Sequence, residues 1–210
     1  MVAGSLWHSF FEVVSIKPIV MANNLVETIQ KNLGLPALQK IDPNIQEVKT
    51  KSLRAPADNL AQAAIPAVLT ALYKLTRTDE GCKAIISGEG NPDWLGTFFE
   101  GKEKSAVDKV ALYAGVSPNE AESIMEDIAD EAVATLKNSI KPKLTPDILR
   151  AFMDVQRHHI LVDLPPAMQM GDVLNDEGLD DRTNKMEGPV SGFMHRIENL
   201  LSKGDESKYP

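Results

Sequence analysis

The chain has 210 residues, 43% of them hydrophobic, and its 30 acidic against 22 basic side chains give a formal net charge of -8. This apolar content is enough for a core and argues against disorder throughout, while the acidic balance disfavours binding to nucleic acid or anionic lipid, which needs clustered Lys and Arg. The single cysteine excludes an internal disulfide, and no run approaches the roughly 18 apolar residues that a membrane-spanning helix needs. We therefore expect a cytoplasmic protein whose partners include neither nucleic acid nor a membrane.

Residues 1–20 (MVAGSLWHSFFEVVSIKPIV) are apolar, but they lack the positive amino-terminal region and the small-x-small cleavage site of a signal peptide. From Met21 the chain has the composition of an ordinary cytosolic start. We expect residues 1–20 to be an upstream extension of the reading frame that is not part of the folded core. The segment at 11–16 (FEVVSI) is the only strand candidate in the sequence.

Between residues 21 and 162 the sequence predicts a succession of helices. The first begins after Asn24, which suits the N-cap position, and Gly34 supplies the left-handed residue that ends it. The pair Asp42-Pro43 predicts a second, short helix, because aspartate caps a helix and proline suits its first position.

Residues 57–76 form the most apolar long segment and predict a buried central helix, which Pro66 should kink or break. A helix opening at Asp79 carries Cys82, which we interpret as a small buried core residue. The next short helix opens at Asp93 and carries an aromatic cluster, which favours a core contact over a ligand platform.

The following stretch carries two helix starts separated by a turn at Gly115. Ser105 with Asp108, and Ser117 with Glu120, both fit the capping box, and a proline follows Ser117 at the first helical position. We therefore predict a helical hairpin. Its pattern AxxAGVSxxxA also resembles the helix-turn-helix of DNA-binding repressors, in which the second helix enters the major groove.

The charge of the second helix argues against DNA contact. Between Ser117 and Leu136 it exposes six carboxylates and contains no Lys or Arg, whereas each phosphate contact normally uses a cation. Repulsion of about 1 kcal/mol per close contact near a protein surface would cancel most non-specific affinity. We interpret this helix as an acidic contact face for a basic protein partner. Its candidate residues are Glu122, Glu126 and Asp130, with Glu120, Asp127 and Glu131 also exposed.

A helix after Pro146 carries His158 and His159 near its end, with Asp154 and Asp163 nearby. Adjacent histidines on a helix point about 100° apart, so they cannot chelate one ion as an i, i+4 pair would. Cations at a helix C-terminus are the simpler interpretation. A metal-dependent enzyme that uses His158, His159 and nearby carboxylates remains the alternative.

No catalytic motif is present: the chain has no nucleophile elbow, phosphate-binding loop, dinucleotide fingerprint or zinc-protease helix. The acidic run at 172–181 also lacks the ligand register of a calcium loop. We therefore predict no cofactor, no metal ligand and no catalytic residue, and enzymatic activity from residues distant in sequence stays open.

The section from 163 to 210 holds ten acidic and five basic residues, a net charge of -5. We predict an acidic tail that contains a long loop at about 170–192 and a short amphipathic helix at about 189–202. The apolar side of this helix would dock on its own domain, on a second copy to give a homodimer, or in a partner's groove. Its candidate contact residues are Phe193, Met194, Ile197, Leu200 and Leu201.

Three motifs carry a resemblance to a known family: LGLP at 33–36, AAIPAVL at 63–69, and VA at 110–111 followed by AGVSPxxA at 114–121. On these motifs the region from about 25 to 138 resembles the YidB-like family of bacterial proteins of unknown function. The resemblance implies an all-helical bacterial domain and supplies no catalytic residues.

Together, these patterns predict an all-α fold, a compact multi-helical bundle of short and medium helices with a helix-turn-helix-like hairpin. The domain would span residues 21–162. The function that fits best is a non-enzymatic protein-protein interaction or scaffold module, with DNA binding and metal-dependent catalysis as the alternatives.

Overall fold

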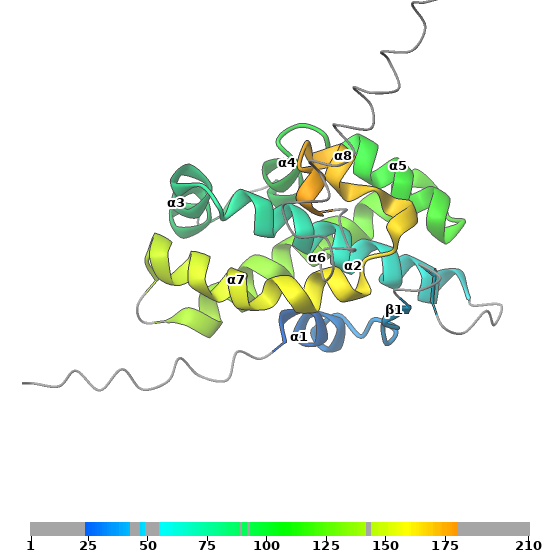
Figure 1. The fold of residues 1–210 in the computed structure, drawn as a ribbon, viewed down its shortest axis with the longest axis horizontal. Coiled ribbons are helices and arrows are strands. Elements are labelled where there is room, and N and C mark those ends of the chain that lie inside the picture. Colours follow the sequence, from blue (N-terminus) through cyan, green and yellow to red (C-terminus); the bar gives the residue numbers. More distant parts are fainter. Residues whose placement is uncertain are drawn as a thin grey trace, which may run out of the picture.

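The computed structural model describes residues 24–42, 47–48, 55–88, 90–91, 93–141 and 144–179. Over these ranges the fold is an all-α bundle of eight α-helices, as predicted (Figure 1). Two 3-10 turns and one antiparallel pair of two-residue strands complete it. In chain order the elements are α1 Leu25–Asn32, β1 Ile41–Asp42, β2 Glu47–Val48, α2 Pro56–Leu75, α3 Asp79–Ser87, α4 Trp94–Phe99, α5 Glu103–Ala114, α6 Pro118–Ile140, α7 Pro146–Asp163, η1 Pro166–Met168, α8 Met170–Leu174 and η2 Glu177–Leu179.

Helix α2 is the centre of the bundle. Every residue from Leu60 to Tyr73 is buried, because α1, α4, α5, α6, α7 and α8 all pack against it. A kink or a break was expected at Pro66, and the helix continues through it, so the break does not occur. Proline removes one backbone donor, and packing on all sides holds the helix together across the missing bond. Among the helices that the structure describes, none combines the length and apolar character that a membrane crossing requires.

Two buried glutamines tie other segments to the central helices. The Gln62 amide donates to the carbonyls of Gln39 at 3.0 Å and Asp163 at 2.7 Å, and its oxygen accepts from the Gln39 N–H at 2.8 Å. On α7, the Gln156 oxygen accepts from the Leu25 N–H at 2.9 Å. These hydrogen bonds join three segments to the central helices: the start of α1, the chain after α1 and the end of α7. They also give the buried amide groups of both glutamines the partners that buried polar groups require.

The helix ends follow the predicted capping chemistry in most cases. The Asn24 side chain accepts from the first turn of α1, and Gly34 follows that helix with a φ of +63°. Ser117 caps α6 by accepting from the Glu120 N–H at 3.3 Å. Gly115 makes the left-handed turn of the hairpin at φ +72°. These positions confirm that local chemistry sets both ends of α1, the end of α5 and the start of α6.

Two predicted helix starts are wrong. Helix α5 begins at Glu103, two residues before the Ser105 capping box, because Glu100 and Gly101 at φ 54° and 82° complete the turn after α4. Residues 47–48, expected in a short helix opened by Asp42, are extended and pair with 41–42. In both places the course of the neighbouring backbone overrides the local pattern.

The apolar face of α7 also differs from the predicted one. Leu149 and Phe152 are buried as expected, whereas Val155 is 59% exposed and Gln156 takes the buried position beside it. A polar side chain with a hydrogen-bond partner can therefore occupy the core position that an apolar pattern would assign to its neighbour.

The core continues past residue 162, where the sequence placed the domain boundary. Leu164, Met168, Met170, Leu174 and Leu179 are buried in the same hydrophobic core as α2. Helix α8 packs against α2 and α5, at positions expected to be loop. These apolar residues are separated by turns, so they show no helical period although each is buried singly.

Several predictions lie outside the described residues. They are the upstream extension at 1–20 with its strand candidate at 11–16, and the apolar face Phe193, Met194, Ile197, Leu200 and Leu201 of the expected C-terminal helix.

Candidate functional site

Helices α5 and α6 form the predicted hairpin and place two chemically different surfaces on the outside of the bundle. The two helices pack on each other and on α2. Their inner faces are buried, with Val110 on α5 and Met125 and Ile128 on α6 fully enclosed. Because these inner faces are fixed by the core, the outward side chains are presented from a rigid support.

The first surface is the α6 acidic row, formed by Glu122, Glu126 and Asp130. All three are exposed, and their spacing of four residues places them along one face of α6. None of them makes a hydrogen bond or ion pair with another described residue. Partial burial raises the pKa of Asp130, and the negative charge of Asp127 raises it further. The row is therefore a line of like charges, spaced so that they repel one another, that forms no ion pair within the described domain.

One of the six carboxylates predicted to be exposed on this helix has a structural role instead. Glu131 is half-buried and accepts hydrogen bonds from Asn32 at 2.8 Å and from Thr135 at 2.7 Å, which joins α6 to the end of α1. Helical periodicity could not show that Glu131 is half-buried, since its partner Asn32 is far away in the sequence.

The second surface is the α5–α8 groove, a shallow hollow of about 680 Å³ between the outer face of α5 and α8. Lys104, Lys109 and Leu112 line it from α5, and Asp172 and Val173 line it from α8. Figure 1 shows these two helices side by side at the edge of the bundle. The groove was not predicted, because its second wall, α8, lies where a loop was expected. Leu112, an apolar residue off the buried face of α5, was the only local signal.

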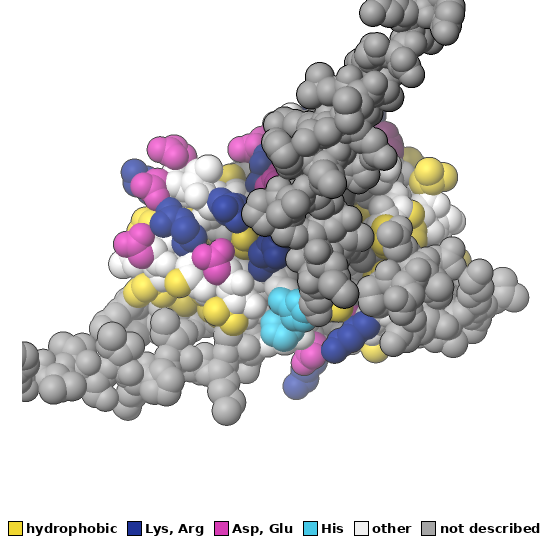
Figure 2. Space-filling model, in the orientation of Figure 1, with side chains coloured by type: hydrophobic (Ala, Val, Ile, Leu, Met, Phe, Trp, Pro, Cys, Tyr) yellow, Lys and Arg dark blue, Asp and Glu magenta, His cyan; other side chains and the backbone are white. Residues whose placement is uncertain are grey.

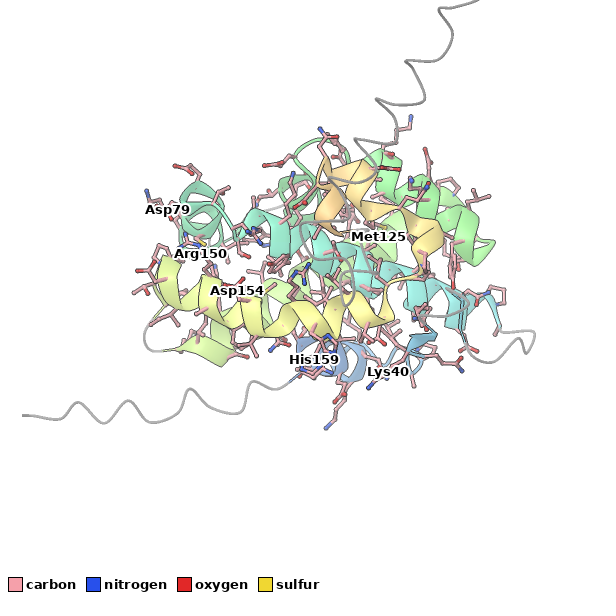
Figure 3. All side chains as sticks on the ribbon, in the orientation of Figure 1. Lys40, Asp79, Met125, Arg150, Asp154 and His159 are labelled. Atoms are coloured by element: carbon pink, nitrogen blue, oxygen red, sulfur yellow. The ribbon has the colours of Figure 1, made fainter. Side chains whose placement is uncertain are left out.

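The α7 histidines point outward. His158 and His159 are exposed, with ring centroids 6.0 Å apart in an edge-to-face arrangement. Figure 2 shows histidine side chains in cyan on the face of the molecule that it draws. Within the described ranges, no three His, Cys, Asp or Glu side chains gather so that they could hold a metal ion. Burial raises the pKa of the Asp163 carboxyl, and the positive charges of Lys40 and His159, labelled in Figure 3, only partly offset this.

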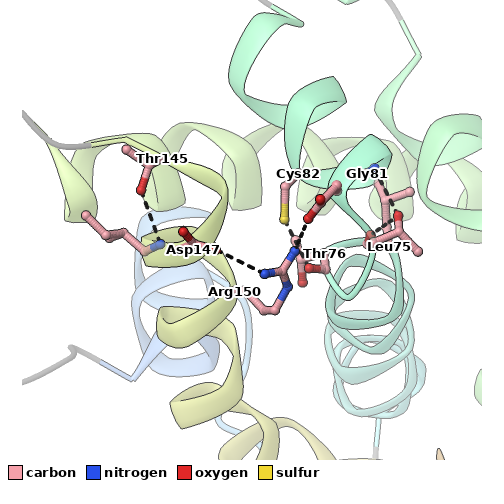
Figure 4. A network of polar contacts seen from close by, with 10 residues as sticks. Leu75, Thr76, Gly81, Cys82, Thr145, Asp147 and Arg150 are labelled. Carbon is pink, nitrogen blue, oxygen red and sulfur yellow. Dashed lines mark hydrogen bonds and ion pairs between the residues drawn. The ribbon is translucent and has the colours of Figure 1, made fainter.

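Arg150 links α7 to α3 near the buried thiol. Its guanidinium pairs with the Asp79 carboxylate and, at 3.3 Å, with Asp147 (Figure 4). Cys82 is fully buried and donates its S–H to the Thr76 carbonyl at 3.0 Å. Burial raises the pKa of the Cys82 thiol more than the Arg150 charge lowers it. Cys82 is therefore a core residue, as predicted, in its less reactive form.

Comparisons of this chain with protein-family models, with curated proteins and with solved structures found no match.

Proposed function

We propose that this chain is a non-enzymatic protein-protein interaction or scaffold module, and that its α6 acidic row binds a basic protein partner. This proposal rests on the observation that Glu122, Glu126 and Asp130 form an exposed line of carboxylates, none of which makes an ion pair with another residue that the structure describes. The three motifs that resemble the YidB-like family support a bacterial protein of that kind, and the acidic composition with a single cysteine supports a cytoplasmic one.

The geometry of the row defines the partner that fits it. Glu122 and Asp130 are eight positions apart on α6, which is about 12 Å along a helix axis. Three Lys or Arg side chains spaced over that length would each meet one carboxylate. An exposed pair contributes only about 0.2–1 kcal/mol, so the row acts together with neighbouring contacts and favours fast, salt-sensitive association.

The test uses a defined probe, a helical peptide with lysines at positions i, i+4 and i+8. The triple variant Glu122→Gln, Glu126→Gln, Asp130→Asn removes the row. The control variant Glu27→Gln, Glu80→Gln, Asp154→Asn removes three exposed carboxylates elsewhere and so matches the change in net charge. This control variant separates the effect of the position of the carboxylates from the effect of total charge.

We expect the row variant to bind the peptide at least about tenfold more weakly than the control variant, which corresponds to roughly 1.4 kcal/mol. Raising the salt concentration should weaken the wild-type interaction. Equal binding by the two variants would show that net charge, and not the row, attracts the peptide. In a separate experiment, a protein that co-purifies from the native cell with the control variant and not with the row variant would be the physiological partner.

The same protein samples test the two alternatives. A salt-dependent shift of duplex DNA at micromolar protein would favour the helix-turn-helix interpretation over ours. Equimolar zinc bound to the purified chain, and lost from a His158→Ala, His159→Ala variant, would favour a metal-dependent enzyme. Either result would overturn the proposal of a non-enzymatic module.

A further inference from the structure

Leu112 is the most exposed large hydrophobic side chain among the described residues, at 84%. It lies in the α5–α8 groove, where Val173 contributes a second, largely buried apolar side chain from α8. A leucine held in water at a concave site is a frequent feature of docking surfaces, because covering it removes apolar area from solvent.

The course of the chain indicates what covers this groove. Helix α8, one wall of the groove, is followed directly by η2, and the two pack together up to Leu179. The last described residue, Leu179, therefore lies close to α8, and 31 residues, 180–210, follow it in the sequence. Nine residues, 180–188, separate Leu179 from the apolar segment and span up to about 30 Å when extended.

We propose that residues 189–202 dock as an amphipathic helix in the α5–α8 groove of the same chain, with their apolar side over Leu112. The two sides match in length. In a helix, Phe193 to Leu201 covers about 12 Å, and the groove-lining face of α5 from Lys104 to Leu112 covers the same distance. This proposal does not depend on the α6 acidic row.

The charges around the groove agree with this occupant. Lys104 and Lys109 stand near Asp108 and Asp172, so the rim carries both signs. The docking segment also carries both signs, with Arg196 and Glu198 beside its apolar residues. A uniformly charged partner such as nucleic acid would meet repulsion from half of such a rim, whereas a mixed-charge helix can satisfy both.

The experiment measures hydrogen exchange of residues 189–202 in the full chain. Leu112→Glu places a charge in the groove, and Val155→Glu introduces the same charge on α7, at the other large hydrophobic residue that is exposed within the described ranges. Both sites are exposed, so both variants should fold. Protection of α2 amides confirms this in each sample. The reciprocal variant Ile197→Glu, Leu200→Glu alters the segment itself.

We expect the segment to exchange at least about tenfold more slowly in the wild type and in Val155→Glu than in Leu112→Glu or the reciprocal variant. Light scattering should give the mass of a single chain. Exchange as fast as in an isolated 189–202 peptide would overturn the proposal, as would protection that survives Leu112→Glu. Protection together with twice the mass would place the segment on a second copy and refute docking within the chain.

Discussion

Replacing Gln62 by methionine tests whether buried hydrogen bonds hold the outer segments on α2. Methionine keeps the length of the side chain and removes its polar atoms. The change leaves the Gln39 N–H and the carbonyls of Gln39 and Asp163 without the partner they have now. An orphaned buried polar group costs about 1–3 kcal/mol, and the Gln39 groups are only partly buried. We therefore expect a total loss of roughly 2–4 kcal/mol.

Urea denaturation, monitored by circular dichroism, measures this loss of free energy, and thermal denaturation measures the corresponding change in Tm. For a domain of this size, 1 kcal/mol corresponds to about 2–4 °C in Tm, so the variant should melt roughly 5–15 °C lower. Leu69→Met introduces methionine at another fully buried position of α2 and should cost less than about 1.5 kcal/mol. The Gln39 amide should also exchange faster in Gln62→Met. If both methionine variants lose the same stability, the hydrogen bonds of Gln62 contribute nothing beyond packing, and the reasoning is refuted.

Three further outcomes follow from other parts of the core. An alanine at Gly81 would overlap the Leu75 carbonyl, so Gly81→Ala should lower the free energy of unfolding by about 1–3 kcal/mol in urea melts, against less than about 0.5 for Gly178→Ala. The pKa of Asp163 in the folded state lies above its ordinary value of 3.8, so between these two pH values the folded state binds more protons than the unfolded state. The contribution of Asp163 to wild-type stability should therefore fall as pH rises from 3.8 through the folded pKa. Asp163→Asn should flatten this slope, and identical slopes would contradict the assignment. The buried thiol of Cys82 should react with a disulfide reagent at least about a hundredfold more slowly in the native protein than in urea, and equal rates would show that it is accessible.

The parts of the fold that the sequence predicted are those set by near neighbours in the chain. Asn24, Ser117 and Gly115 act through backbone groups within a few residues, so their roles follow from local patterns. The burial of α2 follows from its own composition. The acidic row was predictable for the same reason, because a spacing of four residues in a helix defines a face without reference to any other element.

The parts that escaped prediction depend on contacts between distant segments. Gln62 reaches Asp163 across 101 positions in the sequence, and no local pattern marks either residue as a partner. Helix α8 is only five residues long, too short for a period to emerge, and its place beside α5 creates the groove. Leu112 could be recognised from the sequence as an apolar residue outside the buried face of its helix. That it lines a groove follows only from the position of α8 opposite it.

The division between core and surface limits where function can reside in this domain. All 14 positions of α2 from Leu60 to Tyr73 are buried, and the buried polar residue Gln62 bonds to other parts of the same domain. Changes at such positions would alter stability and partner binding together. The outer faces of α5 and α6 make no comparable contribution to the core, so substitutions there can change binding alone. The acidic row and the groove can consequently be tested in separate variants of one folded protein, and binding changes measured in them report on those surfaces directly.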